Sequence, residues 1–217
     1  SAFKKENRLM DICRQRLCQG LEALQLPLNQ LQIEQLLKFI KLIEKWNKAY
    51  NLTAVRDLQE MVSVHLLDSL AILPYIKAVT IADIGTGAGL PGIPLAIALP
   101  DCQFTLVDSN SKKTRFVQQA VLELQLKNVE VVHSRVELLK PKHLFSTVIS
   151  RAFASMPDIL ALTQHLQADD GILLAMKGQV PAQELAELSE TYRVIPVSVP
   201  GIDAERCLIE LERSLHG

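Results

Sequence analysis

The chain has 217 residues, 48% of them hydrophobic and 22% charged, which is typical of a packed globular protein and excludes wholesale disorder. No apolar run approaches the ~20 residues of a membrane-spanning helix, so no membrane partner is expected. The N-terminal stretch does not resemble a secretory signal. Four cysteines without metal-ligand spacing favour reduced thiols, no metal site and a cytoplasmic location.

The net charge of −1 excludes a protein that binds nucleic acid through its overall field alone. The charge is uneven, however, at +3 for residues 1–79 and −4 for the remainder. A nucleic-acid partner would therefore be held by local basic patches. The alternative is that these cations lie on solvated helix surfaces.

From Leu9 to about Leu73 the apolar spacing is that of helices, which predicts a helical N-terminal cap over residues 1–75. The clearest helix begins after Pro27, with Asn29 as its cap, and carries apolar side chains at three- and four-residue steps as far as Trp46. A second helix is predicted from Leu58 to Leu73, ended by Pro74.

From residue 76 to residue 217 the pattern changes to short β-rich runs that alternate with helical ones. This alternation predicts a parallel sheet covered on both faces. The last two β-rich runs have no helical pattern between them, only the turn residues 200–203. They should therefore pair as an antiparallel hairpin. The predicted strands are 79–84, 103–107, 129–133, 147–150, 172–176, 193–199 and 207–211, and the predicted helices lie near 91–99, 112–126, 156–166 and 181–190.

A glycine-rich loop follows the first predicted strand. Gly87, Gly89 and Gly92 satisfy the dinucleotide-binding spacing, with Asp108 where an NAD ribose acid would lie. The same loop reads Asp83-x-Gly85-x-Gly87-x-Gly89, which resembles the first motif of class I S-adenosylmethionine-dependent methyltransferases. The predicted terminal hairpin also favours the methyltransferase. An NAD enzyme and a merely structural glycine turn remain the alternatives.

Two further positions suit an adenosine ligand. The Asp108 carboxylate, at the end of the second strand, can accept hydrogen bonds from both ribose hydroxyls; alternatively it caps the helix that begins near Ser111. Ser134 and Glu137 follow the third strand, where an acidic side chain commonly meets adenine in such methyltransferases. Their spacing is equally that of a helix capping box.

No general base or nucleophile is expected at the end of the fourth strand. Residues 150–153 replace the Asn/Asp-Pro-Pro-aromatic element of enzymes that methylate amino groups, and no cysteine is preceded by proline. Arg151 stands there instead, where ligands bind in open α/β sheets. It would hold the methionine carboxylate or a substrate phosphate, or else pair with Asp83 or another acid. Lys177 after the fifth strand is a similar candidate.

Six stretches in order make a specific pattern. They are WNKAYNLT at 46–53, HLLDSL at 65–70, DIGTGAGLPGIP at 83–94, VDS at 107–109 followed by two lysines, SRA at 150–152 and KG at 177–178. From about residue 30 onward the chain resembles the glucose-inhibited division protein B family, which methylates N7 of guanine 527 in 16S ribosomal RNA.

The resemblance implies an α/β fold of class I S-adenosylmethionine-dependent methyltransferases. That fold has a Rossmann-like seven-stranded sheet with its last strand antiparallel, and here a helical cap on the substrate side. It implies S-adenosylmethionine as cofactor and 16S rRNA or the small ribosomal subunit as partner; a monomer is expected. The implied cofactor-binding residues are Gly85, Gly87, Gly89, Leu90, Asp108, Val136, Glu137 and Arg151.

The resemblance also turns residues of the cap into substrate-side candidates. Trp46, with Tyr50, would stack a base or else belong to the core. Arg151, His65 and Asp68 are positioning candidates, although His65 and Asp68 are one turn apart and would pair on a plain helix. The candidates for RNA binding are Trp46, Asn47, Asn51, Thr53, Lys112, Lys113, Arg115 and Lys177; the three cations at 112–115 are otherwise solvated surface.

The implied chemistry needs little from the protein. Guanine N7 carries an in-plane lone pair and no proton, so it can attack the methyl group directly once the reactants are aligned. No catalytic residue in the strict sense is therefore predicted. An NAD-dependent oxidoreductase and a non-catalytic adenosyl-ligand-binding module remain the rival functions.

Overall fold

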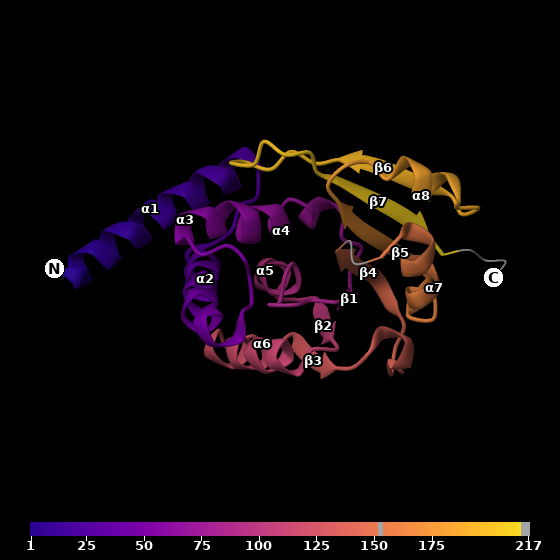
Figure 1. Ribbon diagram of the computed structural model, residues 1–217, viewed down its shortest axis with the longest axis horizontal. Coiled ribbons are helices and arrows are strands. Elements are labelled where there is room, and N and C mark those ends of the chain that lie inside the picture. The colour runs from indigo at the N-terminus through magenta and orange to yellow at the C-terminus, as the bar shows by residue number, and fades with distance from the viewer. Residues whose placement is uncertain (152–153, 214–217) are drawn as a thin grey trace.

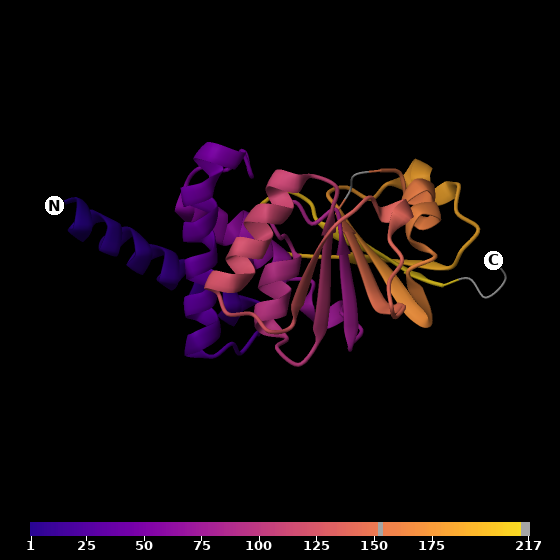
Figure 2. The same ribbon diagram turned by 90° about the horizontal axis from the view of Figure 1, so that it is seen from below.

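The computed structural model describes residues 1–151 and 154–213, which form one seven-stranded sheet with helices on both faces (Figures 1 and 2). The strand order is β3-β2-β1-β4-β5-β7-β6. The strands are β1 (Thr80–Ile84), β2 (Gln103–Asp108), β3 (Val129–His133), β4 (Phe145–Arg151), β5 (Gln167–Lys177), β6 (Tyr192–Pro196) and β7 (Cys207–Glu212).

The sheet is parallel from β3 to β5, and β7 runs antiparallel to both of its neighbours, β5 and β6. The predicted mixed sheet with an antiparallel last strand is confirmed. The order also differs from the 3-2-1-4-5-6 arrangement of dinucleotide-binding dehydrogenases, which weakens the NAD alternative. The largest errors in the strand bounds are at β5, which begins five residues before the predicted 172, and at β6, which ends at Pro196, three residues before the predicted 199.

Helices cover both faces of the sheet, and an apolar cluster lies between the sheet and the helices on each side. One apolar cluster joins the N-terminal helices to α5 (Gly92–Ala98) and α6 (Ser111–Glu123), and a second lies beneath α7 (Met156–Thr163) and α8 (Ala182–Ala186). Residues 1–75 therefore share a core with one face of the sheet. The pattern changes at residue 76 from helices alone to alternating strands and helices, but residues on both sides of this boundary contribute to the same core.

Two long helices open the chain, α1 (Ala2–Ala23) and α2 (Gln30–Tyr50). The predicted cap at Asn29 is confirmed. Its Oδ1 accepts from the Gln32 amide at 2.9 Å, and the Gln32 side chain accepts from the Asn29 amide at 2.8 Å. The start of α1 extends beyond the body of the molecule (Figure 2). In the part of the chain that the structure describes, no helix is long and apolar enough to cross a membrane.

The predicted helix over 58–73 is wrong in its regularity. The chain forms α3 (Leu58–Met61), a π-helix (Val62–Leu67), α4 (Asp68–Leu70) and a 3-10 turn (Leu73–Tyr75) that contains Pro74. In the π-helix the Asp68 amide donates to the carbonyl of Ser63, five residues back. Such turns shift side chains relative to a regular helix and occur frequently at functional sites. Here His65 and Asp68 are both buried.

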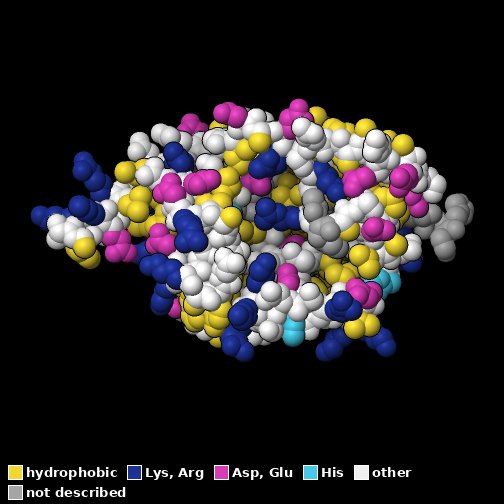
Figure 3. All heavy atoms as spheres, viewed as in Figure 1, with side chains coloured by type: hydrophobic (Ala, Val, Ile, Leu, Met, Phe, Trp, Pro, Cys, Tyr) yellow, Lys and Arg dark blue, Asp and Glu magenta, His cyan; other side chains and the backbone are white. Residues whose placement is uncertain are grey.

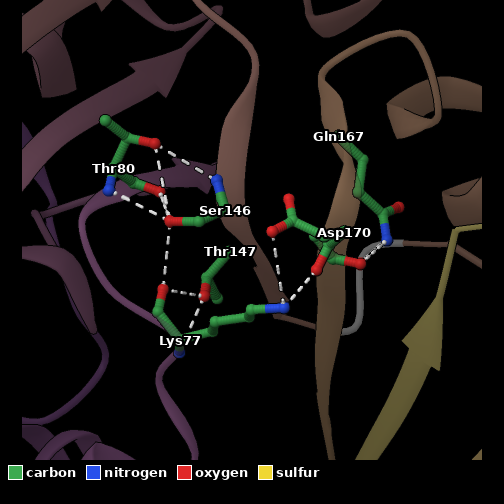
Figure 4. Close-up of polar contacts among 7 residues, drawn as sticks. Lys77, Thr80, Ser146, Thr147, Gln167 and Asp170 are labelled. Carbon is green, nitrogen blue, oxygen red and sulfur yellow. Dashed lines mark hydrogen bonds and ion pairs between the residues drawn. The ribbon is translucent and has the colours of Figure 1, made fainter.

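A polar network fastens the amino ends of β1 and β4, away from the glycine loop (Figure 4). Thr147 Oγ1 accepts from the Lys77 amide at 2.9 Å and donates to the Lys77 carbonyl at 2.6 Å. Ser146 Oγ donates to the Thr80 carbonyl at 2.8 Å and accepts from the Thr80 amide at 3.0 Å. Side chains thus satisfy the backbone where the cap meets the sheet.

Thr147→Val should lower the free energy of unfolding by about 1–3 kcal/mol, because it leaves the Lys77 amide without its buried acceptor and the Lys77 carbonyl with Ser146 Oγ as its one recorded donor. Denaturant unfolding measures this loss. Thr105→Val is the matched control, since Thr105 is a strand residue for which the structure records no side-chain hydrogen bond. Equal stability of the two variants would contradict the role of the Thr147 hydroxyl.

Candidate active site

The glycine loop turns sharply between β1 and α5. Gly85, Gly87 and Gly89 have φ angles of 71°, 60° and 92°, a region that side chains disfavour. At Gly87 an added Cβ would meet nothing within 4 Å, so this backbone faces open space. At Gly89 it would lie 2.7 Å from Ile93 Cδ1. Gly87 therefore leaves room for a ligand, whereas Gly89 allows the loop to pack on α5.

Asp83 fastens this loop from below. Its Oδ2 accepts from Thr86 Oγ1 at 2.7 Å and from the Gly92 amide at 2.9 Å. Complete burial raises the pKa of Asp83 to about 7 despite these bonds. Arg151 makes no ion pair with Asp83 or with any other described carboxylate, so the predicted alternative of an Asp83–Arg151 pair is wrong.

Two cavities meet at Gly85. The first, here called the Asp108 cavity, measures about 380 Å³ and is lined by Gly85, Asp108, Ser109, Ser134, Arg135, Val136, Glu137 and Leu162. The second, the Thr53 cavity, measures about 250 Å³ and is lined by Leu52, Thr53, His65, Gly85, Thr86, Gly87, Ala88, Leu90 and Arg151. The predicted cofactor residues, Gly89 apart, are thus brought to two adjoining spaces.

Asp108 lies at the end of β2 and binds backbone amides with both oxygens. Oδ2 accepts from Gly87 and Oδ1 from Asn110, each at 2.8 Å. The predicted alternative that Asp108 caps the next helix is wrong, because Asn110 caps α6 by accepting from the amides of Lys112 and Lys113. Each Asp108 oxygen keeps a second lone pair, which a hydroxyl donor in the cavity can use.

The turn after β3 also differs from the predicted capping box. Ser134 Oγ donates to the Arg135 carbonyl at 2.8 Å, and the 3-10 turn Val136–Leu138 has no side-chain cap. Val136 and Glu137 line the Asp108 cavity instead.

These residues fit the S-adenosylmethionine that the resemblance implies. The carboxylate of Asp108 suits a ribose diol, the apolar sides of Val136 and Leu162 suit an adenine ring, and the open backbone at Gly87 permits close approach. Arg151, in the adjoining Thr53 cavity, would supply a cation suited to the methionine carboxylate.

The cap contributes a hydrogen-bonded group to the Thr53 cavity. Asn47 Oδ1 accepts from the Thr53 amide at 2.9 Å, and Thr53 Oγ1 lies 2.9 Å from His65 Nε2. Burial, with a smaller effect from Arg151, lowers the pKa of His65 to about 4, so its ring is neutral at neutral pH. Local pattern did not predict the Thr53–His65 contact.

His65 and Asp68 do not pair on a helix, as one alternative held. Asp68 instead binds Arg206, whose Nε lies 3.2 Å from Asp68 Oδ1. Sequence reasoning missed Arg206. A partial signal was available: β7 runs antiparallel to β5, so its amino end lies beside the carboxyl end of β5, and Arg206 immediately precedes β7.

The other substrate-side candidates of the cap do not line the Asp108 cavity or the Thr53 cavity. Trp46 and Tyr50 stack on one another, with ring centroids 5.4 Å apart and planes 11° apart, and both pack against the core. Asn51 is exposed and ends α2 in the left-handed conformation. Stacking of a base on Trp46 therefore remains a prediction that would require the Tyr50 contact to change.

The basic candidates differ in availability. Lys112, Lys113 and Arg115 lie in the first turns of α6 and form no ion pair with a described residue. Lys177 is 9% exposed and lies 3.5 Å from Glu184 and 3.1 Å from the Ala154 carbonyl. On the face of the molecule that Figure 3 shows, Lys and Arg side chains surround a central hollow.

Comparison with known proteins matches residues 32–209 to a family model described as rRNA small subunit methyltransferase G. A Legionella pneumophila protein named ribosomal RNA small subunit methyltransferase G is 57% identical over 80% of this chain and 84% of its own length. A Nitrosococcus oceani protein of the same name is 51% identical over 88% of this chain and 91% of its own.

Solved structures share the fold at low identity. The mitomycin 7-O-methyltransferase MmcR superposes with a TM-score of 0.58 at 16% identity over 81% of this chain and 60% of its own. A SAM-dependent methyltransferase from Aquifex aeolicus gives 0.53 at 18%, covering 67% and 90%. With the family model spanning most of the chain and relatives above 50% identity, the chain belongs to the GidB family of small-subunit rRNA methyltransferases.

Proposed function

We propose that this protein transfers a methyl group from S-adenosylmethionine to N7 of guanine 527 in 16S rRNA. One observation carries the proposal. The Asp108 cavity, suited to an adenosine, shares its lining residue Gly85 with the Thr53 cavity, which the helical cap lines through Leu52, Thr53 and His65. A cofactor methyl group and a base approaching from the cap would meet there.

The proposed cofactor contacts divide between these cavities. Asp108 would accept from the ribose hydroxyls, Val136 and Glu137 would border the adenine, and Arg151 would hold the carboxylate. Gly85, Gly87 and Leu90 would approach through their backbone, and Gly89 would support the turn. Trp46, Asn47, Asn51 and Thr53 remain proposed contacts on the RNA side.

The chemistry requires alignment rather than proton transfer. Bound S-adenosylmethionine supplies an electrophilic methyl group, and guanine N7 supplies the lone pair. The hydrogen-bonded Asn47, Thr53 and His65 would fix one wall of the reaction space, and Arg151 another. Burial of the reactants between cap and sheet would exclude water and hold the attacking atom in line. The target base must leave its stack to arrive there.

The rate of methyl transfer should be nearly constant between about pH 6 and 9, because attack by the N7 lone pair involves no proton transfer. His65, with its pKa lowered to about 4, stays neutral throughout this range. Single-turnover transfer with saturating cofactor and RNA measures the profile. A tenfold loss per pH unit on the acid side, abolished by His65→Gln, would identify His65 as a general base and oppose direct attack by N7.

The basic patch formed by Lys112, Lys113 and Arg115 should contact RNA phosphates. Replacing all three with alanine should weaken RNA binding and flatten its salt dependence, because fewer counterions are released. Affinity for S-adenosylmethionine should hardly change. Replacing Lys4, Lys5 and Arg8, exposed cations at the far end of α1, is the matched control. An unchanged salt slope in the first variant would make the patch solvated surface.

Two binding measurements separate the proposed enzyme from its rivals. Calorimetric titration should show binding of S-adenosylmethionine and none of NAD, whereas an oxidoreductase would show the reverse. Methyl transfer to small subunits that lack the modification should then be catalytic; cofactor binding without transfer would indicate a non-catalytic module. We also propose that the enzyme acts in the cytoplasm, because its substrate belongs to the bacterial ribosome. We propose further that it acts as a monomer.

A further inference from the structure

A third cavity adjoins the site, and the reaction as proposed so far does not use it. This Asp68 cavity measures about 320 Å³, at the lower end of the range for small-molecule sites. It lies at the carboxyl ends of β4 and β5 and the amino end of β7. Its lining includes Asp68, Arg151, Met176, Lys177, Arg206 and Leu208. Arg151 lines both this cavity and the Thr53 cavity, so the two are neighbours.

The walls of the Asp68 cavity suit a flat, polar-edged ring. Ile72 offers apolar surface from the turn after α4, Met176 from β5 and Leu208 from β7. The charged groups are unequally available. Lys177 is already bound to Glu184 and to a carbonyl, whereas Asp68 faces the cavity from the start of α4. The acid is therefore the acceptor that a ligand in this cavity would meet.

The Asp68 carboxylate is held in place with acceptor capacity to spare. Arg206 binds only Oδ1, while its Nη1 donates to the Glu205 carbonyl at 3.0 Å, so the guanidinium is fixed at two points. The Arg206 carbonyl also accepts from the Val197 amide, which ties the loop to β6. Among the described residues, Asp68 Oδ2 has no hydrogen-bond partner, and it is not sealed from solvent.

We infer that the Asp68 cavity receives the flipped target base and that Asp68, held by Arg206, reads the Watson–Crick edge of guanine. This inference rests on the proposed function and names how its substrate base is selected. Guanine alone among the four bases presents two adjacent donors on that edge, N1–H and the N2 amino group, which a carboxylate can accept together.

Adenine presents a lone pair at N1, which the carboxylate repels, so the same contact selects against it. The edge of guanine opposite N2 carries N7. A base held by its Watson–Crick edge at Asp68 therefore turns N7 away from Asp68, and Arg151 marks the side on which the Thr53 cavity adjoins. Reading of the Watson–Crick edge is the general way in which enzymes recognise flipped bases.

Inosine provides the decisive probe, because it keeps N7, O6 and N1–H but lacks the N2 amino group. Small subunits reconstituted with guanosine or with inosine at the target position are compared by their kcat/KM for methyl transfer. The wild type should prefer guanine by about tenfold or more, the size expected for one lost charge-assisted hydrogen bond. In Asp68→Ala the preference should fall to about one, and transfer to guanine should fall at least tenfold.

The ratio separates recognition from structural damage. A variant that is merely misassembled loses activity on both substrates and keeps the wild-type ratio. Asp68→Asn, which preserves side-chain size, and calorimetric binding of S-adenosylmethionine check the fold. Glu210→Gln is the matched control, since it breaks another Arg–carboxylate pair on the same hairpin, Arg193–Glu210 at 3.0 Å, outside the cavity. It should keep the wild-type ratio.

The inference is wrong if the wild type methylates guanine and inosine subunits equally, a result that needs no variant. It is also wrong if Asp68→Ala keeps the wild-type preference. Failure of the proposed function gives a different result, namely no transfer by the wild type to guanine-containing subunits. That result would overturn the assignment of the cavity together with the function.

Discussion

Replacing Arg151 with methionine is expected to lower kcat/KM for methyl transfer about a hundredfold. Arg151 is the only side chain that lines both the Thr53 cavity and the Asp68 cavity as the structure describes them. Charge-assisted hydrogen bonds are worth roughly 1.5–3 kcal/mol each, and a guanidinium can make two in parallel. Steady-state kinetics on unmodified small subunits measure the loss.

The fold should tolerate this change, because Arg151 is exposed and makes no ion pair with a described carboxylate. Arg193→Met is the control, since it removes an exposed arginine from β6, outside the three cavities. Arg151→Lys should recover only part of the rate, because an ammonium keeps the charge without the planar fork. Near-normal kinetics in Arg151→Met would remove Arg151 from the site.

Asp108→Ala should weaken S-adenosylmethionine binding by about tenfold or more, because the ribose hydroxyls lose an ionised acceptor. The structure adds a second cause. The same carboxylate accepts from the Gly87 amide, so its removal also frees the loop that would lie against the cofactor. Calorimetry measures the affinity.

Asp101→Ala is the matched control, because Asp101 is an exposed carboxylate just before the other end of β2. Thermal unfolding should show that Asp108→Ala remains folded. Unchanged affinity in a folded Asp108→Ala protein would leave Asp108 with the structural role of holding the Gly87 and Asn110 amides.

The parallel sheet, its antiparallel terminal hairpin and the glycine loop could be predicted because local patterns indicate them. Strand–helix alternation indicates parallel pairing, and the short segment between the last two strands has no helical pattern that could cross over to a parallel strand. Likewise the glycines at 85, 87 and 89 mark backbone that side chains disfavour, and all three have positive φ.

The substrate side could not be predicted in the same way, because its contacts join distant parts of the chain. Arg206 and Asp68 are 138 positions apart, and no local spacing relates them. The π-helix at Val62–Leu67 is invisible to a search for 3.6-residue periodicity. Capping patterns misled for a different reason. At both Asp108 and Ser134 a nearby backbone group provided a competing partner.

The central claim is that the enzyme methylates N7 directly, without a general base. The identity of the modified nucleoside tests this claim most directly. Small subunits that lack the modification are incubated with the protein and methyl-labelled S-adenosylmethionine, and the RNA is digested to nucleosides. The account predicts that the label elutes as 7-methylguanosine, stoichiometric with subunits and confined to guanine 527. Label in an amino-methylated or carbon-methylated nucleoside, or at another position, would contradict it.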